Sequence, residues 1–149
     1  MGFDTTKGTR GARQPGTMMR LVNAIATPLV RRKGSFAGTD ALVLTTIGRK
    51  TGQKRVNPVN WFPGTDGSWL IIASAAGAAS NPAWYFNIKA NPDKVQIDVG
   101  GKSIPVHAEQ LSGDDRADAW RQISSKPNFA KYQEKTDREL PIIRLTAQL

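Results

Sequence analysis

Beyond residue 40 the chain contains short apolar runs and runs in which apolar and polar residues alternate, and both are typical of β-strands. Such runs occupy residues 42–46, 55–62, 68–73, 94–99, 102–109 and 140–147. Gly100 and Gly101 separate two of the runs and form a two-residue hairpin signal, and another turn is predicted at residues 63–67. Because hairpins dominate the connections, the pattern predicts six antiparallel strands in a small barrel rather than a parallel α/β sheet.

Helical spacing of apolar residues predicts an N-terminal helix and two or three short helices inserted between the strands. The corresponding segments are residues 17–30, 82–89, 114–124 and 128–134. Asn81 is positioned as a capping residue, with Pro82 in the first turn of the helix that follows. Ser112 and Asp115 have the spacing of a capping box for a later helix.

The chain has 149 residues, of which 39% are hydrophobic, and this suits one domain with its own core. Residues 1–16 are rich in Gly, Thr and Arg, lack apolar periodicity and are predicted to form a flexible basic arm. Residues 17–149 are predicted to form a single domain. Neither a secretion signal nor a membrane-spanning stretch is recognisable. We therefore expect a cytoplasmic protein, with membrane association through the basic helix at residues 17–30 as the alternative.

The residue types present exclude several kinds of site. The chain contains no cysteine and one histidine, His107. Disulfides, thiolate metal sites and a cysteine nucleophile are therefore excluded, and a zinc site of the usual Cys/His kind cannot be built. His107 follows Val106 in an alternating strand pattern, so its side chain is predicted to face solvent rather than to take part in catalysis.

The positive charge of the chain is concentrated in its first third. Residues 1–55 contain eleven Lys and Arg against two acidic residues, whereas the rest of the chain contains ten of each kind. The net charge of +9 therefore belongs to this first third. Arg49, Lys50, Lys54 and Arg55 fall in a connection between two predicted strands that is longer than a tight hairpin needs. This loop is predicted to hold an anion: a phosphate ligand, a nucleic acid or a membrane surface.

Two nucleotide-binding motifs are missing from the chain. The cationic loop lacks the Walker Gly-x-x-x-x-Gly-Lys-Ser/Thr pattern, and Gly-x-Gly-x-x-Gly occurs nowhere, which argues against ATP and a Rossmann dinucleotide. A basic nucleic-acid-binding module is the non-enzyme alternative, because the cations alone would suit it. Apart from Trp61, however, no aromatic residue is interleaved with the cations to stack on bases, so no nucleic-acid partner is expected.

Four separated segments resemble those of the deazaflavin-dependent nitroreductase family, in the same order along the chain. They are LTTIGRKTGQKRVNP at residues 44–58, Ala73-Ser74, NPAWYFN followed by ANP within residues 81–92, and TDRELP at residues 136–141. The resemblance implies an α+β or mainly β fold, a split β-barrel of the FMN-binding-like type. It also implies binding of coenzyme F420, a deazaflavin whose tail carries a phosphodiester and glutamates that a cationic loop would hold.

Carried over by position, the resemblance implies which residues contact the coenzyme. The cationic loop would hold the phosphate and the glutamyl carboxylates, the segment at residues 73–77 would line the ring, and the helix after it would complete the pocket. The implied coenzyme-binding residues are Arg49, Lys50, Thr51, Arg55, Asn57, Pro58, Ala73, Ser74, Ala75, Ala76, Gly77, Trp84 and Asn87. Ala75 stands where some relatives carry a basic residue, so one tail contact is expected to be missing.

The implied reaction is hydride transfer from reduced coenzyme F420 to a flat, electron-poor, hydrophobic acceptor: a quinone, an activated enone or lactone, or a nitroaromatic. The protein would position the reactants and exclude water, so neither a nucleophile nor a metal is needed. Asn60, Phe129 and Tyr132 are the implied substrate residues, and Tyr132 is the expected proton donor. An FMN-binding split-barrel oxidoreductase is the alternative enzyme, because a single phosphate suits the same cations.

Overall fold

A computed structural model describes residues 39–148 without a break, together with residues 3, 8, 11, 27, 28, 30, 31 and 34–36. Most of the arm predicted at residues 1–16 and of the helix predicted at residues 17–30 lies outside the described residues. The backbone is helical at residues 27, 28, 30 and 31, where the predicted helix and its basic C-terminal flank meet.

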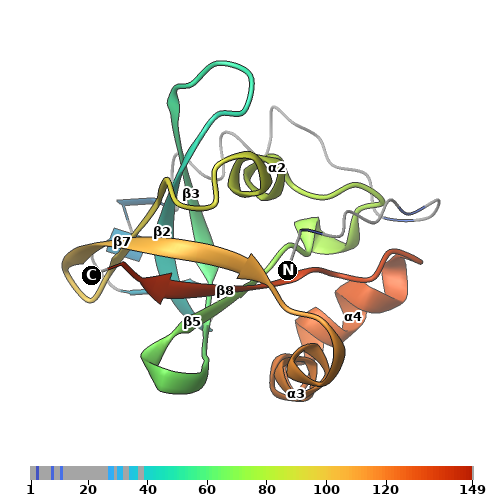
Figure 1. Cartoon of the computed structure of the whole chain (residues 1–149). Helices are drawn as coiled ribbons and strands as arrows, with labels where there is room; N and C mark the ends of the chain where they lie inside the picture. The colour runs from blue at the N-terminus through green and yellow to red at the C-terminus, as the bar shows by residue number, and fades with distance from the viewer. Residues whose placement is uncertain are drawn as a thin grey trace.

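The described strands form one antiparallel sheet that curls into a split barrel (Figure 1). The order across the sheet is β1-β2-β6-β7-β8-β5-β4, with β3 also paired to β2, and β3 and β5 lie in contact. This architecture confirms the predicted split barrel. The strands are β1 (Ser35–Phe36), β2 (Thr39–Ile47), β3 (Lys54–Asn60), β4 (Phe62–Pro63), β5 (Trp69–Ile72), β6 (Val95–Val99), β7 (Lys102–Gln110) and β8 (Ile142–Ala147).

The single strand predicted at residues 55–62 is wrong, because the structure has two strands there. β3 pairs with β2, from Ile47 opposite Lys54 to Ala41 opposite Asn60, whereas β4 pairs with β5. The break falls at Trp61, whose backbone N–H donates to the carbonyl of Asp40 over 3.0 Å. Apolar residues continue through Trp61 and Phe62, so the local pattern could not reveal that the chain changes its pairing partner there.

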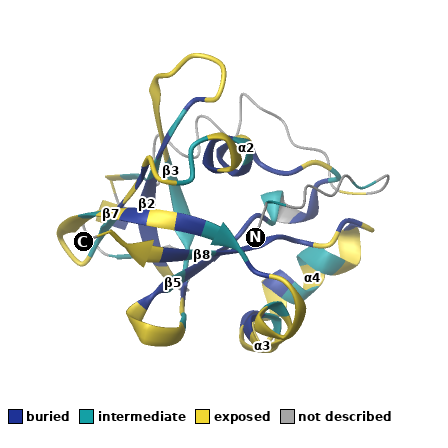
Figure 2. Cartoon of the chain, viewed as in Figure 1, coloured by how far each residue is buried: buried dark blue, intermediate teal, exposed yellow. Residues whose placement is uncertain are grey.

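The hydrophobic core explains why β2 reads as a nearly continuous apolar run. Leu42 and Leu44 are fully buried in the cluster inside the barrel, while Val43, also fully buried, packs with Val30 on the other face. A strand covered on both faces loses its polar alternation. Figure 2 shows β2 and β5 largely buried, while the loop between β2 and β3 is mostly exposed.

Three α-helices are described in full: α2 (Ala83–Ala90), α3 (Gly113–Ile123) and α4 (Pro127–Lys135), with the 3₁₀ turns η1 (Thr65–Gly67) and η2 (Ala75–Gly77). The inserted helices are as predicted, but two caps are not. Pro82 is the N-cap of α2, and Asn81 instead accepts a hydrogen bond from Arg138. Ser112 is the N-cap of α3 but makes no side-chain capping bond.

α2 lies beside the β2–β3 loop, whereas α3 and α4 lie together at the opposite end of the barrel (Figure 1). A second core cluster lies beneath α3 and α4 and includes Phe62, Phe129 and Ile142. His107 is exposed, as predicted, and contacts Asp93. Within the described part of the chain, no helix has the length and apolar character needed to cross a membrane.

Candidate functional site

The loop between β2 and β3 is folded tightly enough to present its cations in a defined arrangement. The backbone N–H of Gly48 donates to the carbonyl of Gln53 over 2.8 Å, and that of Gly52 donates back to the carbonyl of Gly48 over 2.8 Å. Gly52 has φ +70°, a left-handed conformation that residues with a side chain seldom adopt. Thr51 closes the turn by accepting the N–H of Gln53 through Oγ1 over 3.2 Å.

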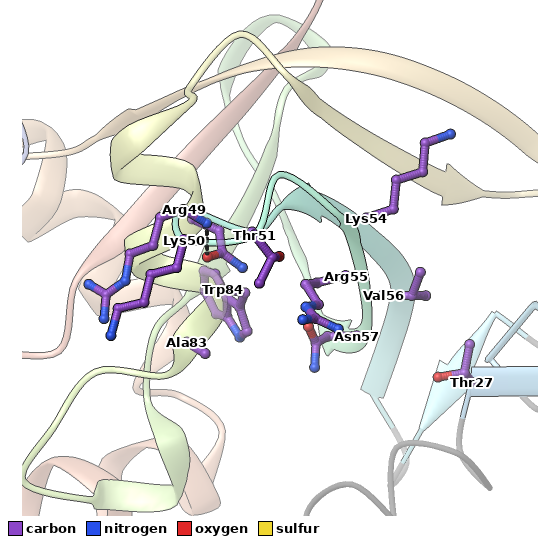
Figure 3. A pocket seen from close by; sticks show the side chains of 12 residues that line it. Thr27, Arg49, Lys50, Thr51, Lys54, Arg55, Val56, Asn57, Ala83 and Trp84 are labelled. Carbon is purple, nitrogen blue, oxygen red and sulfur yellow. Dashed lines mark hydrogen bonds between the residues drawn. The ribbon is translucent and has the colours of Figure 1, made fainter.

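Asn87 ties this loop to α2. Its side chain is 7% exposed. Its Oδ1 accepts the backbone N–H of Arg49 over 3.1 Å, and its Nδ2 donates to Thr46 Oγ1 over 3.2 Å. The first of these bonds is the dashed line in Figure 3. Both ends of the amide are therefore engaged by the protein, and Asn87 positions the cationic loop.

The loop and α2 enclose a groove of about 950 Å³ that is open on one side. Figure 3 shows Arg49 and Lys50 extending on one side of Trp84, with Arg55 and Asn57 on its other side. None of the described lining residues is acidic, so the field in the groove favours an anion. The lining residues are Thr27, Gly48, Arg49, Lys50, Thr51, Lys54, Arg55, Val56, Asn57, Ala83, Trp84 and Asn87.

Two aromatic residues of α2 shape the groove, Trp84 by lining it and Phe86 by contacting Arg49. Trp84 is 7% exposed and belongs to the core cluster inside the barrel, so the same ring packs and lines the groove. The guanidinium carbon of Arg49 lies 4.5 Å from the centre of the Phe86 ring, a cation–π distance. Together with the Asn87 bond, this contact restrains Arg49 at both its backbone and its side chain.

Seven of the thirteen residues that the resemblance assigned to the coenzyme line this groove: Arg49, Lys50, Thr51, Arg55, Asn57, Trp84 and Asn87. Sequence reasoning did not assign Thr27, Gly48, Val56 or Ala83. Lys54 and Val56 lie on the opposite face of β3 from Arg55 and Asn57 (Figure 3), and among the described strands β3 pairs with β2 alone. The groove therefore reaches both faces of an edge strand, which strand alternation by itself does not predict.

The segment at residues 73–77 does not line the groove, and its backbone accepts hydrogen bonds from Arg138. Ala73 is fully buried, and its carbonyl accepts from Arg138 Nη1 over 3.0 Å. Arg138 Nη2 donates to the carbonyl of Ser74, also over 3.0 Å. Pro58 pairs with Val43 within the ladder between β3 and β2. Sequence reasoning gave Arg138 no role, although Arg138 lies in the TDRELP segment that contributes to the family resemblance.

Burial shapes the electrostatics of Arg138. Its side chain is 1% exposed, and this burial lowers the pKa of its guanidinium, while interaction with Tyr85 raises that pKa in part. Arginine remains charged despite such a shift, because its ordinary pKa lies far above neutral pH. The permanent positive charge of Arg138 therefore lies against the backbone carbonyls of the segment at residues 73–78.

The three implied substrate residues lie away from the groove. Phe129 is 3% exposed, with its ring centre 5.5 Å from that of Phe62 and 5.7 Å from that of Tyr132. Tyr132 is half-buried on α4, which packs against η2. Asn60, at the far end of β3 from the loop, donates to the carbonyl of Asp40 over 3.4 Å. The structure thus brings seven of the residues predicted to bind the coenzyme together in one groove but does not bring this second set to them.

The structure is a split barrel with a cationic groove in which none of the described lining residues is acidic, a setting that favours an anionic ligand. Residues 18–147 match the family F420H(2)-dependent quinone reductase, and the chain belongs to this family. The match confirms the resemblance to F420-dependent reductases that the four sequence segments predicted.

Individual relatives agree with the family assignment. An F420H(2)-dependent quinone reductase of Mycobacterium tuberculosis is 40% identical over 111 residues, which are 71% of this chain and 72% of that protein. A solved structure of an F420-H2 dependent reductase, FDR-A, is 36% identical with a TM-score of 0.63, and the match covers 71% of this chain and 93% of that one. A FAD-binding protein from Mesorhizobium loti shares the fold at 14% identity and a TM-score of 0.51, with 85% of this chain and 87% of that one covered.

Proposed function

We propose that this protein transfers a hydride from reduced coenzyme F420 to a quinone, and that the groove between the β2–β3 loop and α2 holds the anionic tail of the coenzyme. As a member of the F420H(2)-dependent quinone reductase family, the chain is an oxidoreductase that uses reduced coenzyme F420. The observation that carries the assignment of the groove is its charge: Arg49, Lys50, Lys54 and Arg55 line it without an acidic residue among the described ones.

The residues of the groove have complementary roles in this proposal. The planar forks of Arg49 and Arg55 suit the phosphodiester and the glutamyl carboxylates, and Lys50 adds a mobile charge. Thr51 and Asn57 contribute polar contacts beside them, while Asn87 keeps the loop in place through Arg49. Binding energy from the tail would fix the ring relative to the acceptor, which is how a remote contact contributes to rate.

The ring would lie beyond Trp84, toward Pro58 and the segment at residues 73–77. When bound, the reduced coenzyme supplies the hydride, and the protein supplies position and exclusion of water. Tyr132 remains the proposed proton donor, because it lies on the helix that packs against η2. Of the three implied substrate residues, Asn60 and Tyr132 have exposed surface to contact an acceptor, whereas Phe129 would support Tyr132 by packing.

Two further expectations remain proposals. One is a single domain at residues 17–149, which the family match over residues 18–147 supports, and a basic arm at residues 1–16 is proposed to precede it. A cytoplasmic location with reversible contact between residues 17–30 and anionic lipid would bring the enzyme to apolar quinones. Co-sedimentation of the full chain with anionic and with neutral vesicles tests this contact, and equal recovery in both would contradict it.

The decisive test is a fluorescence titration of the purified protein with coenzyme F420, followed by anaerobic mixing of the reduced coenzyme with menadione. We expect saturable binding and acceptor-dependent reoxidation. Arg55→Ala should weaken binding, whereas Arg121→Ala should not, because Arg121 is an exposed cation paired with Asp118 on α3. Absence of binding by the folded wild-type protein would refute the proposal, and a yellow protein that retains FMN would favour the alternative coenzyme.

A further inference from the structure

Arg138 uses every donor of its guanidinium on one short segment of the chain. Nε donates to the carbonyl of Ala78 over 3.2 Å, and Nη2 donates to the same carbonyl and to that of Ser74, each over 3.0 Å. Nη1 donates to the carbonyl of Ala73 over 3.0 Å and to Asn81 Oδ1. Five N–H groups therefore serve four acceptors within residues 73–81, all far away in the sequence.

Arg138 is itself held firmly by the chain around it. Its backbone N–H donates to Thr136 Oγ1 over 3.1 Å, and its carbonyl accepts from Gln133 Nε2 over 2.7 Å. Among the ion pairs that the described residues form, none involves Arg138. Its charge is therefore compensated by the carbonyl dipoles of the 73–78 segment, and these dipoles are in turn oriented by the charge.

Fixing two successive carbonyls also fixes two amides. In a trans peptide the C=O and the N–H of the same unit point in opposite directions. The carbonyls of Ala73 and Ser74 point to Arg138, so the N–H groups of Ser74 and Ala75 point away from it. No backbone hydrogen bond that the structure describes uses either of these amides, whereas the neighbouring N–H groups of Ala73, Gly77 and Ala78 all donate to carbonyls.

The segment would not keep this shape by itself. Ala75 has φ +45° and Gly77 has φ +82°, and the first of these is a conformation that residues with a side chain seldom adopt. A Cβ on Gly77 would lie 2.8 Å from the carbonyl oxygen of Tyr132, so α4 closes on the turn from one side. Figure 1 shows the turn between α2 and α4.

We infer that Arg138 is a positioning residue for the coenzyme ring: it orients the 73–78 segment so that the amides of Ser74 and Ala75 face the bound ring. The inference rests on the proposed function. It separates two groups of arginines, because Arg49 and Arg55 would act on the tail of the coenzyme while Arg138 would act on its ring.

Two ligands and five variants test this separation. The ligands are intact coenzyme F420 and the same coenzyme truncated before its phosphodiester, each titrated by fluorescence into the full chain. Arg138→Lys keeps the charge but cannot reach all four acceptors from one nitrogen. We expect it to weaken both ligands by the same factor, about 10-fold or more, as lost hydrogen bonds would. Arg55→Ala should weaken the intact coenzyme and leave the truncated one unchanged.

Arg116→Lys is the matched control for a loss of stability alone. Arg116 has a side chain 16% exposed and donates through Nη2 to the carbonyl of Leu140 over 2.9 Å, but none of its described contacts reaches the 73–78 segment. It should lower the melting temperature without changing either affinity. Arg138→Ala should regain affinity for the truncated coenzyme in millimolar guanidinium but not in an equal concentration of sodium chloride.

Ala75→Gly tests the orientation of the 73–78 segment through a change in the segment itself. It serves in case the Arg138 variants do not fold. Glycine accepts φ +45° without strain, so the fold is preserved while the segment becomes looser. It should weaken the truncated coenzyme about 3-fold. If folded Arg138→Lys or Ala75→Gly binds the truncated coenzyme as the wild type does, the inference is wrong while the proposed function stands. If the wild type binds neither ligand, the proposed function itself has failed.

Discussion

The arginines at the β2–β3 loop and the arginine beneath η2 occupy opposite environments in one small barrel. Arg49 and Arg55 are exposed on a groove with no acidic residue among its described lining. Arg138 is 1% exposed and donates all five guanidinium N–H groups to the protein. The exposed pair has donors left for a ligand, whereas the buried residue has none left.

This difference separates affinity from stability. An exposed guanidinium contributes little to folding, because water solvates it in the folded and the unfolded chain alike. A buried guanidinium stabilises the acceptors around it, and its removal leaves buried carbonyls without donors. Variants of Arg138 should therefore lose mainly stability, whereas variants of the exposed arginines should lose mainly coenzyme affinity.

The largest expected loss of stability follows Arg138→Met. The carbonyls of Ala73, Ser74 and Ala78 would lose their charged donor inside the protein. We expect the free energy of unfolding in urea to fall by about 4 kcal/mol. A loss below about 1 kcal/mol would show that water or a neighbouring donor satisfies these carbonyls, and the contrast between the two arginine environments would disappear.

Phe129→Ala should come next, at about 3 kcal/mol, because it removes a buried ring that packs between Phe62 and Tyr132. Coenzyme affinity should stay within about 2-fold of the wild type, since the side chain of Phe129 lies in the second core cluster and not in the groove. Chemical denaturation and fluorescence titration measure the two effects. A raised KM for menadione with unchanged stability would instead assign Phe129 to the substrate wall.

Asn87→Ala should affect both properties to an intermediate degree. It removes the bonds to Arg49 N–H and Thr46 Oγ1, which should cost about 1–2 kcal/mol of stability. Because the cationic loop loses its anchor on α2, we also expect about 10-fold weaker F420 binding. Asn87→Asp retains an acceptor for the Arg49 N–H and should bind better than Asn87→Ala at high salt. Unchanged affinity in both variants would mean that the loop holds its shape without α2.

Arg55→Ala should have the smallest effect on folding, within about 0.5 kcal/mol. Loss of charge-assisted contacts should nevertheless weaken F420 binding by about 10- to 100-fold. The deficit should narrow as ionic strength rises, because salt screens exposed charges. The control Arg121→Ala removes the same charge from α3, and an equal loss of affinity there would point to general attraction rather than to a site in the groove.

Part of the fold and of the site could be predicted from local pattern and composition. Strand alternation indicated an antiparallel barrel, and the cationic loop at residues 48–55 indicated an anion site, because both are properties of neighbouring residues. The family resemblance, which the match over residues 18–147 confirms, came from motifs whose order along the chain is itself sequence information. The absence of cysteine likewise excluded thiolate chemistry without any structure.

Other features depended on contacts between residues far apart in the chain. The guanidinium of Arg138 binds groups 57 to 65 residues away, and Asn87 bonds to groups 38 and 41 residues away. No local periodicity records such pairs, so Asn81 was predicted to be a helix cap when it is an acceptor for Arg138. The sequence alone determined which charges and strand faces exist, and the tertiary structure decided which of these charges are exposed for a ligand and which are buried, because burial depends on what packs against each residue.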